Sequence, residues 1–231
     1  MKIGTDAVLL GSWCKTGSSI HAADLGAGSG ILSLMLAQRG LQKVTAIESD
    51  MHAAMQASSN FSLSPWPEKF ETICADVHHL RESLKASFDL IISNPPFHEG
   101  HIESIDIERN KARQATGNPE EFRKNWFETA FELSKDAGLL NIIFPYTDEG
   151  KWLASAASAG WFHSHLCRVR GNSKAAYSRT MACFTKSKVD SIAIEELCIE
   201  TDNRGFYTDS YKALTQEFYL ERVFSRTKGI S

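Results

Sequence analysis

The segment that follows an apolar run at residues 88–93 has side chains suited to holding an amino group. It reads Asn94-Pro95-Pro96-Phe97. Two consecutive prolines cannot donate to a sheet ladder or continue into a helix, so they fix the direction of the chain as it leaves the strand. A rigid amide acceptor beside an aromatic ring suits a flat substrate with an exocyclic amino group. We therefore predict that these four residues form a catalytic site.

Residues 24–30 form a second candidate site and read Asp-Leu-Gly-Ala-Gly-Ser-Gly. They follow a short strand predicted over 20–24 and precede a helix. The packed face of that helix is predicted to comprise Ile31, Leu34, Met35 and Gln38. Glycine lets the backbone approach a ligand closely, and a helix N-terminus offers free N–H groups. The G-x-G-x-G spacing differs from the G-x-G-x-x-G of dinucleotide enzymes. The predicted ligand is nucleotide-like, and its predicted contacts are Asp24, Gly26, Ala27, Gly28 and Gly30.

Two acidic residues end later strands. Glu48 closes a strand predicted over 43–48, where a carboxylate can accept hydrogen bonds from ribose hydroxyls. A role beside a helix N-cap is the alternative, and the glycine loop favours ribose binding. Asp76 follows a strand predicted over 70–74, where it can contact an adenine amino group while Val77 covers the ring. The alternative interpretation, that Asp76 only initiates a loop, is nearly as well supported. The predicted contacts here are Glu48, Ser49, Asp76 and Val77.

The N-terminal residues 2–11 predict a short helix, with Thr5 or Asp6 as its N-cap and an end near Gly11. On the residues alone, a capped terminal helix is the favoured interpretation. Further predicted elements are helices over 49–60, 119–135, 148–159 and 210–224, strands over 138–144, 161–170 and 177–186, and a candidate edge strand over 191–200. The polar residues 98–118 are long enough to be a substrate loop.

Strands and helices alternate, and a glycine loop follows the first strand. This pattern predicts a doubly wound, Rossmann-like α/β sheet of seven mostly parallel strands, with a C-terminal antiparallel pair. No linker or repeat interrupts residues 1–231, so we expect one domain. Ligands bind such sheets at the carboxyl ends of the strands. The candidate residues should therefore converge on one edge.

Composition narrows the class of protein. The chain of 231 residues is 42% hydrophobic and 23% charged, as is usual for globular proteins. It has no apolar run that could cross a bilayer and no signal-peptide pattern, so we expect a cytoplasmic protein with no membrane partner.

Five scattered cysteines lack a C-x-x-C pair, and the adjacent His78 and His79 lack further ligands, so we expect no metal. We also expect a monomer.

Basic residues gather in one part of the sequence. The net charge of −3 argues against a generally basic nucleic-acid binder, yet residues 161–188 contain six basic residues and no acidic one. These are Arg168, Arg170, Lys174, Arg179, Lys186 and Lys188. Such a patch could contact phosphates. The alternative interpretation, that these residues form a solvated face of two strands, is equally well supported. We predict that the patch shares a face with Asn94.

The glycine loop, Glu48, Asp76 and the Asn-Pro-Pro-aromatic segment, in that order, resemble the class I methyltransferases that use S-adenosyl-L-methionine. In that class the segment is typical of enzymes that methylate adenine N6, guanine N2 or a glutamine amide. Residues 2–11, 91–97 and 207–220 further resemble bacterial enzymes that methylate N6 of adenine 37 in a valine tRNA. Phe97 stands where Tyr is common in that family, and both side chains can stack.

The resemblance implies S-adenosyl-L-methionine as cofactor and tRNA as substrate. It implies that residues 1–19, with Thr5 and Asp6, lie over the methionine end of the cofactor, and that 207–224 form a C-terminal helix. Asn94 would contact the cofactor as well as the base. Its Oδ1 and the Pro95 carbonyl would accept the two N6 hydrogens while Phe97 stacks on the base, without a metal.

Other functions remain open on the sequence. Glutamine methylation of a release factor normally involves an extra N-terminal helical domain, and rRNA or DNA amino groups are further targets. The fitting distance between the glycine loop and Glu48 also allows a nicotinamide-dependent oxidoreductase, which the glycine spacing disfavours. A non-catalytic binding module is the last alternative. Substitution of Asn94 separates these classes, because only a methyltransferase should depend on it.

Overall fold

The computed structural model describes residues 4–95, 118–220 and 223–224. Pro96, Phe97 and nearly all of the predicted substrate loop lie outside these residues. The strands are β1 (His21–Leu25), β2 (Lys43–Glu48), β3 (Phe70–Cys74), β4 (Phe88–Ser93), β5 (Ser134–Pro145), β6 (Phe162–Arg170), β7 (Tyr177–Thr185) and β8 (Ala193–Cys198). The helices are α1 (Thr5–Trp13), α2 (Ile31–Gln38), α3 (Met51–Ser62), α5 (Pro119–Leu133), α6 (Glu149–Ser158) and α7 (Asp209–Thr215). Short 3-10 turns are η1 (Pro67–Lys69), η2 (Val77–Leu80) and η3 (Tyr146–Asp148).

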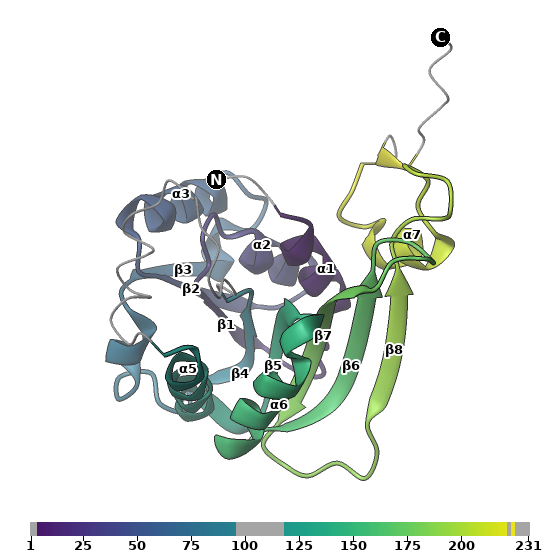
Figure 1. Ribbon diagram of the computed structural model, residues 1–231. Helices are drawn as coiled ribbons and strands as arrows, with labels where there is room; N and C mark the ends of the chain where they lie inside the picture. Colours follow the sequence, from purple (N-terminus) through teal and green to yellow (C-terminus); the bar gives the residue numbers. More distant parts are fainter. Residues whose placement is uncertain (1–3, 96–117, 221–222, 225–231) are drawn as a thin grey trace.

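The eight strands of the described residues belong to one sheet with the order β3-β2-β1-β4-β5-β7-β6-β8 (Figure 1). The first five strands in this order are parallel, and β7 runs antiparallel to both β5 and β6. The mixed α/β sheet and its antiparallel pair confirm the predicted fold class. The predicted number of seven strands is wrong, because β8 pairs in parallel with β6 and adds an eighth.

Helices cover both faces of the sheet, as the strand sequences require. In β1, Ala22 and Ala23 point to opposite faces and enter different hydrophobic clusters, and Leu90 and Ile91 of β4 do the same. One cluster lies under α1, α2 and α7, and the other lies under α5 and α6 (Figure 1). Strands buried on both faces read as continuous apolar runs, which explains the composition of residues 90–92.

The first helix differs from its prediction at both ends. Gly4 is the N-cap residue, so Thr5 and Asp6 lie inside the first turn and neither side chain caps the helix. The helix continues past Gly11 to Trp13. A Cβ atom at Gly11 would lie 2.5 Å from the Met35 sulfur, so this glycine permits close packing of α1 on α2 and does not end the helix.

Two other helices also correct the sequence interpretation. In α2 the buried side includes Leu32, Met35 and Leu36, whereas Gln38 is exposed, because α2 is enclosed by both the sheet and α1. The C-terminal helix α7 is much shorter than the predicted 210–224. The Phe218 N–H donates to the Thr215 carbonyl, three residues earlier, so the chain turns instead of continuing as an α-helix.

Candidate functional site

The predicted site residues follow four neighbouring parallel strands. The glycine loop follows β1, Glu48 ends β2, Asp76 follows β3, and Asn94 follows β4. In space these strands have the order β3-β2-β1-β4 and run in the same direction. Their carboxyl ends therefore form one continuous edge, as the sequence predicted, and we call it the carboxyl edge.

The glycine loop has a backbone that only glycine adopts easily. Gly26, Gly28 and Gly30 have φ angles of 71°, 57° and 80°, in the left-handed region. A Cβ atom at Gly30 would also lie 2.5 Å from the Phe61 ring of α3. The Asn60 side chain donates to the Ser29 carbonyl at 2.8 Å and holds the loop against α3.

Glu48 links the glycine loop to the start of α3. It is 6% exposed, and its Oε2 accepts a hydrogen bond from the Gly28 N–H at 2.8 Å. Its Oε1 accepts from the Asp50 N–H at 3.0 Å, and the Ser49 hydroxyl lies 3.5 Å away. Asp50 in turn caps α3. Glu48 therefore also neighbours a helix N-cap, which was the alternative interpretation from the sequence.

Asp24 is fully buried and only half satisfied. Its Oδ2 accepts from the Ser33 N–H at 3.0 Å and from the Ser33 hydroxyl at 2.7 Å. Among the described residues, its Oδ1 has no hydrogen-bond partner. Burial raises the pKa of Asp24 to about 7, although the bonds from Ser33 oppose this shift. The open oxygen suits a ligand that donates a hydrogen bond or carries positive charge.

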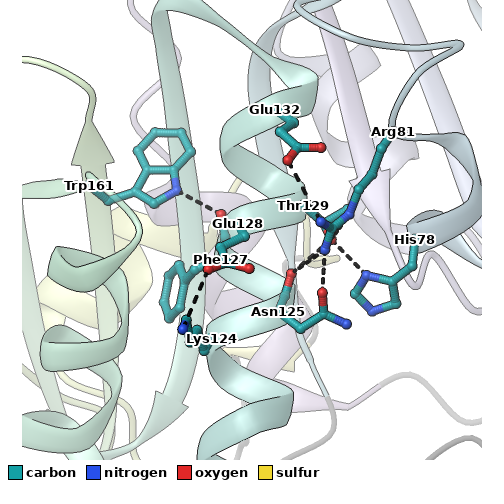
Figure 2. Close-up of polar contacts among 9 residues, drawn as sticks. All are labelled: His78, Arg81, Lys124, Asn125, Phe127, Glu128, Thr129, Glu132 and Trp161. Carbon is teal, nitrogen blue, oxygen red and sulfur yellow. Dashed lines mark hydrogen bonds and ion pairs between the residues drawn. The ribbon is translucent and has the colours of Figure 1, made fainter.

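Asp76 is exposed and accepts a hydrogen bond from the His78 N–H at 2.9 Å, so it initiates the η2 turn. Figure 2 shows how the turn is attached to α5. His78 Nδ1 lies 2.6 Å from the Thr129 hydroxyl, and Arg81 Nε donates to the same oxygen at 2.9 Å. Burial lowers the pKa of His78. The neutral ring fits this contact, since Arg81 is close by. Asp76 and Val77 thus project from a fixed turn.

Asn94, like Asp24, has an acceptor oxygen that no group among the described residues uses. The residue is partly buried and follows the buried Ser93, whose hydroxyl donates to the Leu25 carbonyl at 2.6 Å. Asn94 Oδ1 is inaccessible to solvent and lacks a hydrogen-bond partner among the described residues. A buried amide oxygen without a partner costs free energy, so it marks a place where a ligand can donate.

Similarity to known proteins assigns the family. The sequence profile described as "Methyltransferase small domain" matches residues 3–118. The chain belongs to this methyltransferase family. A relative from Flavobacterium johnsoniae, 38% identical over 96% of this chain and 93% of its own length, is named tRNA1(Val) (adenine(37)-N6)-methyltransferase. A Photorhabdus laumondii protein with the same name is 32% identical over 95% of this chain and 89% of its own length.

Solved structures agree on the fold of the methyltransferase. A predicted O-methyltransferase from Agrobacterium tumefaciens has a TM-score of 0.70 at 19% identity, covering 92% of this chain and 96% of that one. A ribosomal protein L11 methylase from Lactobacillus delbrueckii has a TM-score of 0.55 at 16% identity, covering 79% and 77%. In the described part of this methyltransferase, no helix could span a membrane and no His, Cys, Asp or Glu cluster could hold a metal.

The first turn of α1 also reaches the carboxyl edge of the methyltransferase. Asp6 Oδ2 accepts from Arg179 Nε at 2.8 Å, and Arg179 lies opposite Pro145, the last residue of β5. The other end of α1 is held by the buried Asn141, which exchanges two hydrogen bonds with the Lys15 backbone. Sequence reasoning missed both partners, because each lies more than 100 residues from the contact it makes.

The basic patch does not stay together in the folded methyltransferase. Arg168, Arg170, Lys174 and Arg179 lie at the carboxyl edge, where β6 ends and β7 begins. Lys186 and Lys188 follow the far end of β7, and Lys186 donates to the Ser134 carbonyl at the start of β5. The prediction that the patch shares a face with Asn94 is therefore right for the first four residues and wrong for the last two. They are separated because β7 runs from Tyr177 at this edge to Thr185 near the opposite edge of the sheet.

Proposed function

We propose that this methyltransferase transfers a methyl group from S-adenosyl-L-methionine to N6 of adenine 37 in a valine tRNA. The observation that supports it most is the buried Oδ1 of Asn94, which has no hydrogen-bond partner among the described residues. An acceptor held in this place suits an exocyclic amino group. The relatives that match over nearly the whole chain are named for methylation of such a group.

The residues at the carboxyl edge fit S-adenosyl-L-methionine. Gly26, Gly28 and Gly30 form a backbone cradle, and the open Asp24 Oδ1 suits the cationic amino-acid end. In our proposal, Glu48 and the adjoining Ser49 face the ribose. Asp76 and Val77 face the adenine ring from the turn fixed on α5. When bound, S-adenosyl-L-methionine supplies an electrophilic methyl group on a sulfonium.

The chain's own part in the reaction is to position the amine and make it more nucleophilic. The N6 lone pair of adenine is delocalised into the ring, so the amine is a poor nucleophile. Asn94 Oδ1 and the Pro95 carbonyl would accept its two hydrogens, draw the nitrogen toward tetrahedral geometry and orient the lone pair. In this proposal Pro96 would stiffen the segment and Phe97 would stack on the base. An unpaired loop nucleotide can be turned out at low cost.

The N-terminal segment completes the proposed cofactor site. The ion pair between Asp6 and Arg179 holds the first turn of α1 at the carboxyl edge. Thr5 and the free N–H groups of that turn would then face the methionine end of the cofactor.

We further propose that residues 1–231 act as one domain, as a monomer in the cytoplasm, with residues 98–118 contacting the substrate.

Methyl transfer to total tRNA, from a strain that lacks such an enzyme, tests the proposal. Labelled S-adenosyl-L-methionine is supplied, and the nucleosides are then separated. The expected product is N6-methyladenosine in one valine tRNA, lost with Asn94→Ala. Label in rRNA, in DNA or in a protein glutamine, with none in tRNA, would show that the substrate is wrong. Failure of the protein to bind S-adenosyl-L-methionine would contradict the cofactor assignment.

A further inference from the structure

Beside Asn94, the carboxyl edge carries a row of aromatic and cationic side chains. Tyr146 lies in η3, directly after β5, and Tyr177 begins β7. Their ring centroids are 5.1 Å apart, and the rings are tilted by 53°. The Arg168 guanidinium lies 5.7 Å from the Tyr146 centroid, and that of Arg170 lies 5.6 Å from the Tyr177 centroid. The two rings are thus tilted and not stacked on each other, and each has a guanidinium over one face.

The two arginines support the rings instead of offering free charge. Arg168 donates to both carboxylate oxygens of Glu149, at 3.1 and 2.7 Å, and Thr180 donates to the same carboxylate. Arg170 lies 3.9 Å from the Glu196 carboxylate. Both cations are therefore neutralised locally and would add little to the attraction of phosphates.

Lys174 is the exception in this region. It is exposed in the turn between β6 and β7, and its backbone N–H bonds to the Asn172 side chain. Among the residues that the structure describes, its ammonium group has no ion-pair partner. This lysine therefore remains available for a phosphate, and it lies three residues before Tyr177 in the chain.

We propose that Tyr146, Tyr177 and Lys174 form an RNA-binding surface for the nucleotides that flank the target adenine. This inference rests on the proposed function. Ser93 of β4 pairs with Ile142 of β5, so Tyr146 lies three residues beyond the level of Asn94, or about 10 Å along the strand direction. Unpaired bases in RNA loops are commonly bound by stacking on tyrosine rings, and one lysine beside them would hold the backbone.

Binding of a fluorescent anticodon stem-loop of valine tRNA, measured at several salt concentrations, tests the surface. Tyr146→Leu and Tyr177→Leu keep apolar bulk but remove stacking, and each should weaken binding about tenfold while the salt dependence stays unchanged. Tyr146→Phe and Tyr177→Phe retain stacking and should bind like the original chain. Lys174→Ala should weaken binding and reduce the slope of log K against log salt by about 1.

Matched controls lie at the opposite edge of the same sheet. Trp66 precedes β3 and lies under Lys69, at 5.5 Å, and Lys188 is exposed after β7. Trp66→Leu and Lys188→Ala should leave stem-loop binding unchanged. Leucine variants that bind like the original chain, or controls that lose as much affinity, would overturn the proposed surface. If the original chain binds the stem-loop but does not methylate it, the proposed function fails while the surface is retained. If it binds no stem-loop, the surface fails too.

Discussion

The two halves of the candidate site differ in how well their polar atoms are satisfied. At the glycine loop, Glu48 uses both carboxylate oxygens on the Gly28 and Asp50 N–H groups. At the end of β4, Asn94 Oδ1 has no hydrogen-bond partner among the described residues. Glu48 is thus fixed in place before any ligand arrives, whereas Asn94 leaves an acceptor open. This contrast is expected when one half binds a cofactor and the other acts on a substrate.

The contrast predicts that Asn94 controls turnover more than binding. Asn94→Ala should lower kcat by about a hundredfold to a thousandfold, because the acceptor matters most as the amine changes geometry. The Kd for S-adenosyl-L-methionine should change little. Single-turnover methylation of tRNA and calorimetric titration of the cofactor measure the two quantities. If Asn94→Ala weakened cofactor binding as strongly as turnover, the proposed role of Asn94 in turnover alone would be contradicted.

Asp24 is the exception to this comparison, because it lies beside the glycine loop and one of its carboxylate oxygens has no hydrogen-bond partner among the described residues. Its pKa in the folded protein is raised to about 7 from an ordinary value of 3.8, so the folded state binds the proton more tightly than the unfolded state. Stability should therefore fall as pH rises from about 4 to about 7 and then level off. The loss is at most about 4 kcal/mol.

Asp24→Asn provides the control for this pH dependence. Chemical denaturation at several pH values should show a flatter profile in the variant, since the titrating group is gone. S-adenosyl-L-methionine carries positive charge, so its addition should lower the pKa of Asp24 and flatten the profile of the original chain. Identical profiles for the two proteins without cofactor would contradict the burial argument.

Glu48 should show the opposite behaviour to Asn94. Glu48→Gln keeps the shape of the side chain but weakens its acceptance of the Gly28 N–H and of ribose hydroxyls. Charge-assisted hydrogen bonds are worth about 1.5–3 kcal/mol, so cofactor affinity should fall roughly tenfold to hundredfold. At saturating cofactor, kcat should be nearly unchanged. A fall in kcat without a change in KM for the cofactor would reverse the proposed division of roles.

Local sequence patterns predicted the elements that form the site, but they did not predict the long-range contacts between those elements. The predicted bounds of β2, β3 and β4 match the structure, and Asn118 and Pro119 mark the start of α5 as expected. By contrast, the candidate edge strand over 191–200 is present as β8, but its pairing with β6 was not predicted, because β8 exposes most of its residues and lacks the alternation of a half-buried strand. The hydrogen bond from Arg179 to Asp6 depends on tertiary packing, which no local sequence pattern predicts.

That ion pair gives the smallest expected effect and separates two roles for Asp6. Asp6 and Arg179 side chains are 26% and 34% exposed, so the pair should contribute less than about 1 kcal/mol to stability. Asp6→Ala and Arg179→Ala should therefore unfold at nearly the same denaturant concentration as the original chain. The exposed pair between Lys43 and Glu71, at 3.0 Å, provides the control for any general loss of charge.

Cofactor affinity shows what Asp6 does beyond pairing. If it only positions α1, Asp6→Ala and Arg179→Ala should each weaken S-adenosyl-L-methionine binding by the same few-fold, and the double variant should be no worse than either. If Asp6 also contacts the cofactor, its substitution should be the more damaging, and part of that loss should persist when Arg179 is already absent. Positioning alone would then be excluded, and the first turn of α1 would belong to the binding site itself.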